Sequence, residues 1–373
     1  MTRRVLVQAH LWLGLVLGFV WALQGLTGAA LVFHREVDRW SLPDAVAGPM
    51  APIDGLIAQA ERHAGTAIDR IGIADARGDL LSASYTDAAG AHRAVLLDAA
   101  TGAPVAARED EPATPLAGSA SRWLYTLHEA LLMGDRGETF VGASGLFLLT
   151  ATITGLWLGW PRRRAWKAAF AARRWRTAAQ MLFGWHRMVG LVAGAVLLVS
   201  VPGGVWMIFQ ADLRPALAGA VPFRLPFTAP PAPEASVPRI TPGAALAAAR
   251  ARFPDARFVR LTLPTAKAFA YTIRLRQPGE TRAWSGVTAV AVDPVAGRVL
   301  DVYDPLEAPL ANRLADAAFS AHNGEIGGLG GRLLVMLAGL SLPALYATGL
   351  LAWARKRRTR ARNREARRRL AAA

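Results

Sequence analysis

The sequence of 373 residues contains no cysteine, which excludes disulfide bonds, iron–sulfur clusters and thiolate metal sites. Acidic residues are also scarce: 27 Asp and Glu stand against 43 Lys and Arg, giving a formal net charge of +16. Such an excess also occurs in nucleic-acid-binding proteins. Here, however, the basic residues gather beside long apolar runs, and 53% of the chain is hydrophobic. We therefore expect a membrane protein in contact with the lipid bilayer and no nucleic-acid partner.

Four apolar segments are each long enough to cross a bilayer, which takes about 20 helical residues. They cover residues 11–33, 140–160, 188–209 and 333–353. The basic clusters comprise Arg3 and Arg4, then Arg162, Arg163, Arg164, Lys167, Arg173, Arg174 and Arg176, and finally the tail from Arg355 to Arg369. Because positive charge concentrates in cytoplasmic connections, both termini are predicted to be cytoplasmic and the two long connections periplasmic, in a bacterial inner membrane.

Each long connection has the pattern of a small α+β module. In the second, residues 242–252 are alanine-rich and follow Thr241, a suitable helix N-cap. Apolar and polar residues then alternate within 259–275, and this period of two is typical of half-buried strands. The first connection shows a weaker version, with a predicted helix at 53–64 and a strand at 95–97.

The second half of the chain repeats the first. His10, Gly14, Gly18, Gly28 and Phe33 recur at one constant offset as His186, Gly190, Gly194, Gly204 and Phe209. His128, Gly134, Gly145, Thr154 and Gly155 recur at another as His322, Gly328, Gly339, Thr348 and Gly349. We therefore predict a mainly α membrane protein, whose four transmembrane helices form two parallel helix–module–helix repeats about an axis along the membrane normal.

The repeats divide the chain into eight predicted parts. They are transmembrane helix 1 (1–34), periplasmic module 1 (35–122), a periplasmic-side helix with transmembrane helix 2 (123–160), a basic cytoplasmic loop (161–184), transmembrane helix 3 (185–209), periplasmic module 2 (210–318), transmembrane helix 4 (319–354) and a basic cytoplasmic tail (355–373).

Four of the seven histidines occupy repeat-equivalent positions beside membrane segments. The repeat symmetry places His10 opposite His186 near the cytoplasmic face, and His128 opposite His322 near the periplasmic face. An imidazole at membrane depth is costly unless it is paired or liganded. Two facing imidazoles supply both axial ligands of a haem iron, so we predict two b-type haems. Zinc prefers three or four clustered ligands, which two separate pairs do not offer.

His34 is the rival ligand on the periplasmic side. It follows His10 by about 36 Å along a straight helix at 1.5 Å per residue, so the two cannot serve one haem. Its repeat partner is Gln210, which weakens the symmetry argument for it. His63 and His92 fall in the first module and are expected at its surface. A single histidine within a membrane is also often only a hydrogen-bond partner between helices.

Glycines and one arginine near the histidines leave two interpretations open. Gly14 and Gly18, like Gly190 and Gly194, either admit a flat macrocycle or allow close helix packing. Arg187 either pairs with a haem propionate or adds to the cytoplasmic positive charge.

Around these histidines the sequence resembles the PepSY-associated transmembrane family. The matching segments are His10-Leu-Trp-Leu-Gly14, Leu127-His128 with Thr154-Gly155-Leu156-Trp157, Trp185-His186-Arg187 with Gly190, and His322-Asn323-Gly324-Glu325. The modules resemble PepSY domains, chiefly through Asp98 to Gly102 and Asp293 to Gly297. The resemblance implies a di-haem siderophore reductase or iron-regulated inner-membrane protein, which delivers electrons to a periplasmic ferric siderophore or another acceptor and releases iron as Fe(II).

No nucleotide-binding fingerprint occurs in the sequence, so an external donor, a quinol or a cytoplasmic reductase, is expected. The alternative is a non-redox, membrane-anchored regulator or binding scaffold that uses the PepSY-like modules. A transporter is a third possibility, because parallel repeats occur there too, but the spans lack Asp, Glu or Lys for coupling ions.

Overall fold

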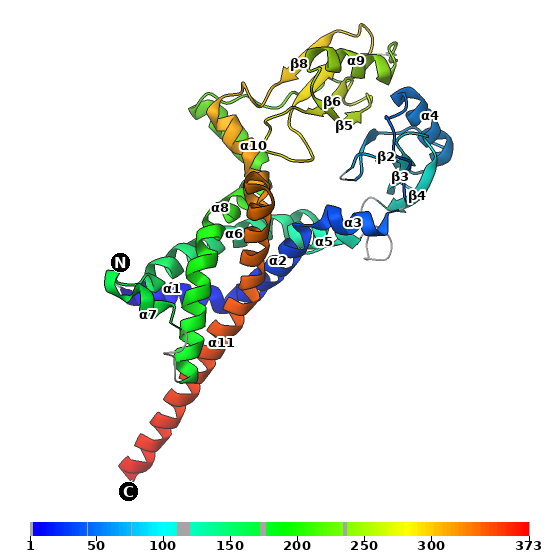
Figure 1. Ribbon diagram of the computed structural model, residues 1–373. Helices are drawn as coiled ribbons and strands as arrows, with labels where there is room; N and C mark the ends of the chain where they lie inside the picture. Colours follow the sequence, from blue (N-terminus) through cyan, green and yellow to red (C-terminus); the bar gives the residue numbers. More distant parts are fainter. Residues whose placement is uncertain are drawn as a thin grey trace. The chain divides into compact units, whose positions relative to one another are not determined.

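The computed structural model describes residues 3–42, 44–75, 77–109, 120–171, 177–233 and 237–372 (Figure 1). The chain divides into two compact units. The helical unit comprises Met1–Val32, Leu127–Phe209 and Ala321–Ala373, and the sheet unit comprises Phe33–Thr126 and Gln210–Ser320. Three arginines of the predicted basic loop, Arg173, Arg174 and Arg176, lie outside the described residues.

The helical unit is built from long apolar helices. Its elements are α1 (Arg3–Val16), α2 (Gly18–Leu31), α6 (Gly134–Gly159), η1 (Arg163–Ala165), α7 (Trp166–Ala169), α8 (Ala178–Ala220, whose last turns belong to the sheet unit), η3 (Glu325–Gly327) and α11 (Gly328–Ala372). By length and composition, α6, α8 and α11 are each long and apolar enough to cross a membrane. Helices α1 and α2 reach that length only when they are taken together as one span. The described chain thus contains three or four candidate spans, which makes it a multi-pass membrane protein.

The predicted first span is not one continuous helix, because α1 and α2 meet at Leu17 with a bend of 64°, although the pair together is long and apolar enough to cross a membrane. The bend coincides with Gly18, whose residue type lowers helix propensity. Gly18 also packs directly beneath the aromatic ring of Tyr346 on α11, where an added Cβ would collide. The straight-helix distance from His10 to His34 therefore does not apply.

Helix α11 extends much further than the fourth predicted span. It continues without a break through the basic residues that follow Trp353, and these are exposed as far as Ala372. The predicted tail is therefore a helical extension. Within the apolar part, Gly339 meets Gly25 of α2, and a Cβ on either residue would collide with the other's backbone. This close approach is typical of membrane helix pairs with small residues at the crossing.

The sheet unit contains one antiparallel sheet of eight strands in the order β4-β3-β2-β1-β5-β6-β7-β8. The strands are β1 (Arg70–Ile73), β2 (Leu80–Thr86), β3 (His92–Asp98), β4 (Pro104–Glu109), β5 (Arg257–Thr262), β6 (Tyr271–Arg276), β7 (Ala289–Val292) and β8 (Val299–Tyr303). Pairing of β1 with β5 joins the two predicted modules, with Ile71 opposite Leu261. The modules therefore share a sheet, which the sequence patterns do not indicate.

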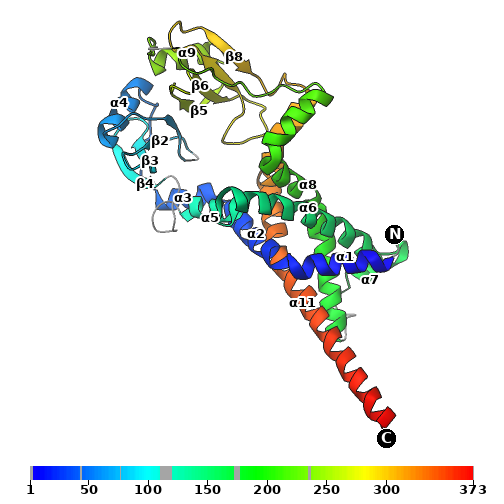
Figure 2. The ribbon, with the colours of Figure 1, turned by 180° about the vertical axis from the view of Figure 1, so that it is seen from behind.

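Two helices cover one face of this sheet (Figure 2). They are α4 (Ile53–Ala64) and α9 (Pro242–Arg252), which confirms both predicted module helices, and the Thr241 side chain caps α9 by accepting from the Ala244 amide. Leu56 of α4 and Leu246 of α9 join the core that contains Ile71 and Leu261. The described residues also form the helices α3 (His34–Ser41), α5 (Ala120–Ala130) and α10 (Leu310–His322).

The repeated Asp-to-Gly signature forms equivalent hairpin turns. Asp98 Oδ1 accepts from the Thr101 amide at 2.8 Å, and Asp293 Oδ1 accepts from the Val295 amide at 2.8 Å. Gly102 and Gly297 adopt φ values of +74° and +72°, which glycine reaches without the steric cost of a Cβ. This part of the repeat therefore serves the β3–β4 and β7–β8 connections.

Candidate functional site

The structure brings the four repeat-equivalent histidines together as two pairs inside the helical unit. His10 of α1 faces His186 of α8, with ring centroids 6.2 Å apart and an angle of 83° between the planes. His128, near the end of α5, faces His322, the last residue of α10, at 6.0 Å and 47°. The pairing predicted from the repeat is thus present in the geometry.

The first pair is held by backbone and hydroxyl groups of facing helices. His10 Nδ1 lies 3.0 Å from the Ala151 carbonyl oxygen on α6. His186 Nδ1 lies 3.1 Å from the Leu345 carbonyl oxygen and 3.1 Å from Thr348 Oγ1, both on α11. Ala151 and Leu345 are equivalent in the repeat, so both histidines are oriented in the same manner.

The second pair is held by one side-chain hydroxyl and one backbone carbonyl. His128 Nδ1 lies 2.9 Å from Thr27 Oγ1 on α2. His322 Nδ1 lies 2.9 Å from the Ser200 carbonyl oxygen on α8.

The turn after α5, which follows His128, has a strained backbone. Both Leu131 and Leu132 adopt positive φ, a conformation that costs free energy for residues with a Cβ.

These contacts define the tautomer of all four rings. A carbonyl oxygen only accepts, so Nδ1 of His10, His186 and His322 carries the proton. The Thr27 hydroxyl already donates within α2, to the carbonyls of Leu23 or Gln24, and it therefore accepts from His128.

A neutral imidazole that carries its proton on Nδ1 keeps a lone pair on Nε2. No hydrogen bond from any of these Nε2 atoms to the described parts of the chain is present. An imidazole fixed through Nδ1–H to a carbonyl is the usual arrangement of a metal-binding histidine. Each pair therefore has two ring nitrogens that make no hydrogen bond within the described chain.

A glycine lies under the Cε1 atom of every paired ring. A Cβ added to Gly28 or Gly204 would come within 2.8 Å of Cε1 of His128 or His322, respectively. Gly155 and Gly349 stand in the same relation to His10 and His186, at 2.9 and 3.4 Å. These four repeated glycines make room for the imidazoles, a role that sequence reasoning missed although the repeat itself was the signal.

A cavity of about 530 Å³ adjoins the first pair, a volume typical of ligand-binding sites. Its lining includes His10, His186, Gly14, Gly18, Gly155, Gly190, Gly194 and Gly349, with Arg3, Arg187 and Lys356 as the cationic members. The close-packing interpretation holds for Gly18 and Gly194, which pack tightly against Tyr346 and Leu156. Gly14 borders open space, with no atom within 4 Å of an added Cβ.

The other histidines are not part of these pairs. His34 begins α3 within the sheet unit, whereas all four paired histidines belong to the helical unit. His63 on α4 and His92 at the start of β3 are exposed, which confirms the expectation for both. Among the described residues, no group of three or more His, Asp or Glu side chains is arranged to hold a metal ion.

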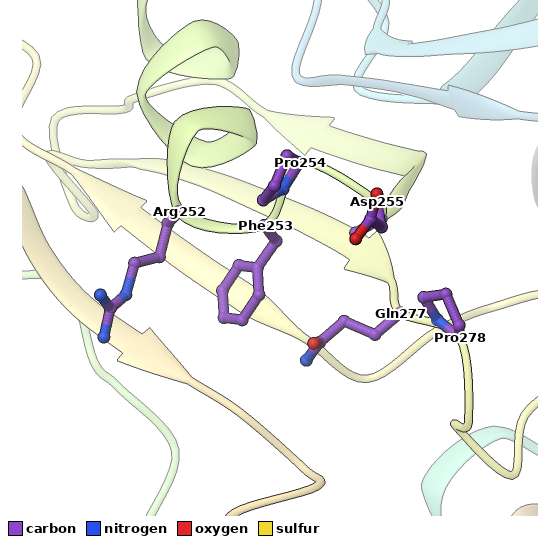
Figure 3. Close-up of a pocket in the computed structure, with 7 residues that line it drawn as sticks. Arg252, Phe253, Pro254, Asp255, Gln277 and Pro278 are labelled. Carbon is purple, nitrogen blue, oxygen red and sulfur yellow. The ribbon is translucent and has the colours of Figure 1, made fainter.

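A separate pocket of about 350 Å³ lies in the sheet unit, beside the end of α9 and the end of β6 (Figure 3). Arg252 and Asp255 lie at opposite sides of it, with Phe253 and Gln277 between them. Because its polar groups do not converge on one point, it is a weaker site than the histidine pairs.

Comparison with known proteins identifies a family. No curated protein matches the sequence. The model of the PepSY-associated TM region family matches residues 7–356, a span that includes both histidine pairs and the whole sheet. The chain therefore belongs to the PepSY-associated TM region family.

Proposed function

We propose that the protein is a di-haem electron-transfer protein of the bacterial inner membrane, with both termini in the cytoplasm. His10 and His186 would hold one b-type haem, and His128 and His322 the other. The observation that carries the proposal is the repeated pairing of imidazoles, with ring centroids 6.2 and 6.0 Å apart, whose Nε2 atoms make no hydrogen bond within the described chain.

The separations suit two ligands on one metal. An imidazole nitrogen binds a transition metal at about 2.0 Å, so the two histidines of each pair would be close enough to hold one metal between them. Around the first pair, the apolar cavity with its small residues suits a flat macrocycle. The cationic groups of Arg3, Arg187 and Lys356 at this cavity suit the propionates, and Arg187 Nε is buried without a hydrogen-bond partner in the described chain.

When bound, each haem supplies a one-electron carrier. The chain's own groups orient the ligands and raise their basicity: the Ala151 and Leu345 carbonyls act on the first pair, and Thr27 and the Ser200 carbonyl act on the second. Burial of the pairs among apolar helices excludes water, which further influences the reduction potential.

The direction of transfer follows from the proposed topology. A quinol or a cytoplasmic reductase would give up electrons on the cytoplasmic side, and a periplasmic acceptor would take them. We propose a ferric siderophore as the acceptor, which gains one electron per iron as Fe(III) becomes Fe(II). Fe(II) binds hard oxygen ligands more weakly, so the iron would be released.

The test is the visible spectrum of the detergent-purified protein, oxidised and then reduced with dithionite, with haem counted per chain. We expect a b-type spectrum and about two haems per chain, as two bis-histidine sites require. His10→Ala should retain one haem and lose electron transfer to ferric chelates, whereas His63→Ala, on the exposed side of α4, should retain both. Colourless protein from haem-replete cells would overturn the proposal and favour the non-redox regulator or scaffold.

A further inference from the structure

The sheet face opposite α4 and α9 carries two arginines at its centre. The register places Arg260 of β5 directly opposite Arg274 of β6, and such opposed side chains project from the same face. The residues opposite this pair on the next strands are small: Gly72 of β1 lies opposite Arg260, and Ala289 of β7 lies opposite Arg274. Two arginine side chains therefore project side by side from one face of the sheet, and the stem of Arg260 lies against Gly72, where an added Cβ would come within 3.1 Å of the Arg260 Cβ.

This arrangement is unfavourable for the protein alone. Like charges directly opposite in a sheet repel, and both side chains are half-buried. Burial, followed by repulsion from Arg274 and Arg70, lowers the pKa of Arg260 to about 10. Arg214 of α8 adds further positive charge near Arg274. Four cationic side chains thus influence one region of the sheet unit.

The nearest carboxylates, those of Asp316 and Glu280, make no ion pair with Arg260 or Arg274 in the described chain. Asp316 accepts from the Tyr303 hydroxyl at 2.5 Å. Glu280 accepts from Thr288 Oγ1 at 2.7 Å and from the Gln277 amide at 2.8 Å. Both carboxylates act on Arg274 electrostatically and offset part of its charge, but neither makes a hydrogen bond or an ion pair with Arg274 or Arg260 in the described chain.

The arginines keep donors without acceptors. Within the described ranges, the side chains of Arg260 and Arg274 make no hydrogen bond or ion pair. The Nε atoms of Arg274 and Arg214 are buried and have no hydrogen-bond partner there. A buried donor without an acceptor destabilises the folded state, so native proteins seldom retain one without a reason. An oxyanion at this position would satisfy the donors and cancel the repulsion.

Hydroxyl groups surround the arginines on the same face. On β2, Ser82 lies opposite Gly72 and Ser84 lies opposite Arg70. Thr262 of β5 lies on the other side of Arg70, and Thr272 of β6 lies opposite Thr262. We propose that this face, centred on Arg260 and Arg274, binds a small polyanion that presents carboxylate or phosphate oxygens, because arginine forks bind both groups through two parallel hydrogen bonds. The inference goes beyond electron transfer and does not require haem.

The test uses the full-length protein in neutral detergent at low ionic strength, titrated calorimetrically with citrate and with pyrophosphate. We expect binding at one site per chain by at least one of the two ions, which identifies the ligand group as carboxylate or phosphate. Arg260→Gln and Arg274→Gln should each weaken binding at least tenfold. Arg274→Lys should bind with intermediate affinity, because it keeps the charge but loses the fork. Arg250→Gln, an exposed position on α9 at the other face, should bind as wild type does.

A second measurement keeps the test decisive if a variant binds poorly for reasons of folding. Without added anion, Arg274→Gln should melt at the same temperature as wild type or higher, because the repulsion is relieved. A lower melting temperature would identify Arg274 as a structural residue and overturn the proposal. Absence of binding to wild type, or equal binding by Arg260→Gln and Arg250→Gln, would overturn it as well.

Discussion

At the scale of single residues, the histidine pairs depend on atoms that lie on neighbouring helices. Each ring donates through Nδ1 to a facing helix and rests against a glycine there. The pairing itself was predictable, because four histidines at repeat-equivalent positions imply two facing pairs. The hydrogen-bond partners were not predictable: the carbonyls of Ala151, Leu345 and Ser200 are backbone groups, which leave no signature in residue types.

The glycine contacts give a prediction at this scale. Gly204→Ala should displace the His322 ring, because the new Cβ would come within 2.8 Å of its Cε1. If the proposed function holds, we expect the electron paramagnetic resonance signal of one low-spin haem to shift or disappear and the other to stay unchanged.

The matched control is Gly330→Ala on α11, where an added Cβ meets no atom within 4 Å. This variant should keep both signals, and alanine should favour its helix by about 0.5–1 kcal/mol. Unchanged spectra for Gly204→Ala would mean that the ring has no role as a fixed ligand.

At the scale of elements, the sequence predicts most helices and strands but not where they bend or stop. Both module helices are correct, since a cap or an amphipathic pattern marks them. The break at Leu17 escapes prediction because the apolar run continues through it, and because Tyr346, which packs against Gly18 beside the break, lies more than 300 residues away in sequence. Helix α11 continues beyond the predicted end of the fourth span, near Trp353, because the basic, polar residues that follow can also form a helix.

The hairpin turns provide a prediction about pH. Hydrogen bonds from the Val295 and Ala296 amides, with help from Arg298, lower the pKa of Asp293 below its ordinary value. A carboxylate with a lowered pKa contributes stability that is complete above about pH 4, the pKa in an unfolded chain, and is lost as the pH falls through the folded-state value.

Asp293→Asn should therefore be less stable than wild type at neutral pH, and the difference should shrink below about pH 4. Thermal unfolding of both proteins across this range measures it. Asp212→Asn, at an exposed position on α8, serves as the control. A difference that stays constant with pH would show that the ionised form of Asp293 does not stabilise the turn.

At the scale of the whole chain, the joining of two modules into one sheet was not predictable from local patterns. Edge pairing between β1 and β5 connects segments that are far apart in sequence, and alternating residues look the same in an edge strand and in a central one. Membrane spans, by contrast, are visible from length and composition alone, so that part of the fold was predicted.

The shared sheet predicts that the two modules unfold together. Ile71→Ala should lower the free energy of unfolding by about 2–5 kcal/mol, because Ile71 is fully buried at the β1–β5 junction. Hydrogen exchange should then become faster in both β3 and β7. Val237→Ala, at an exposed position, should change neither strand. Faster exchange confined to β2, β3 and β4 would show that the modules unfold independently.

The β1–β5 junction also bears on aggregation. A half-chain expressed alone would end its sheet at β1 or at β5, with a row of unsatisfied amides and carbonyls open to any passing strand. In the full chain, each repeat covers the other's vulnerable edge, and the outermost strands are β4 and β8 instead. Keeping both repeats on one polypeptide thus holds the protective strand at high local concentration during folding, before strands of neighbouring molecules can compete for it.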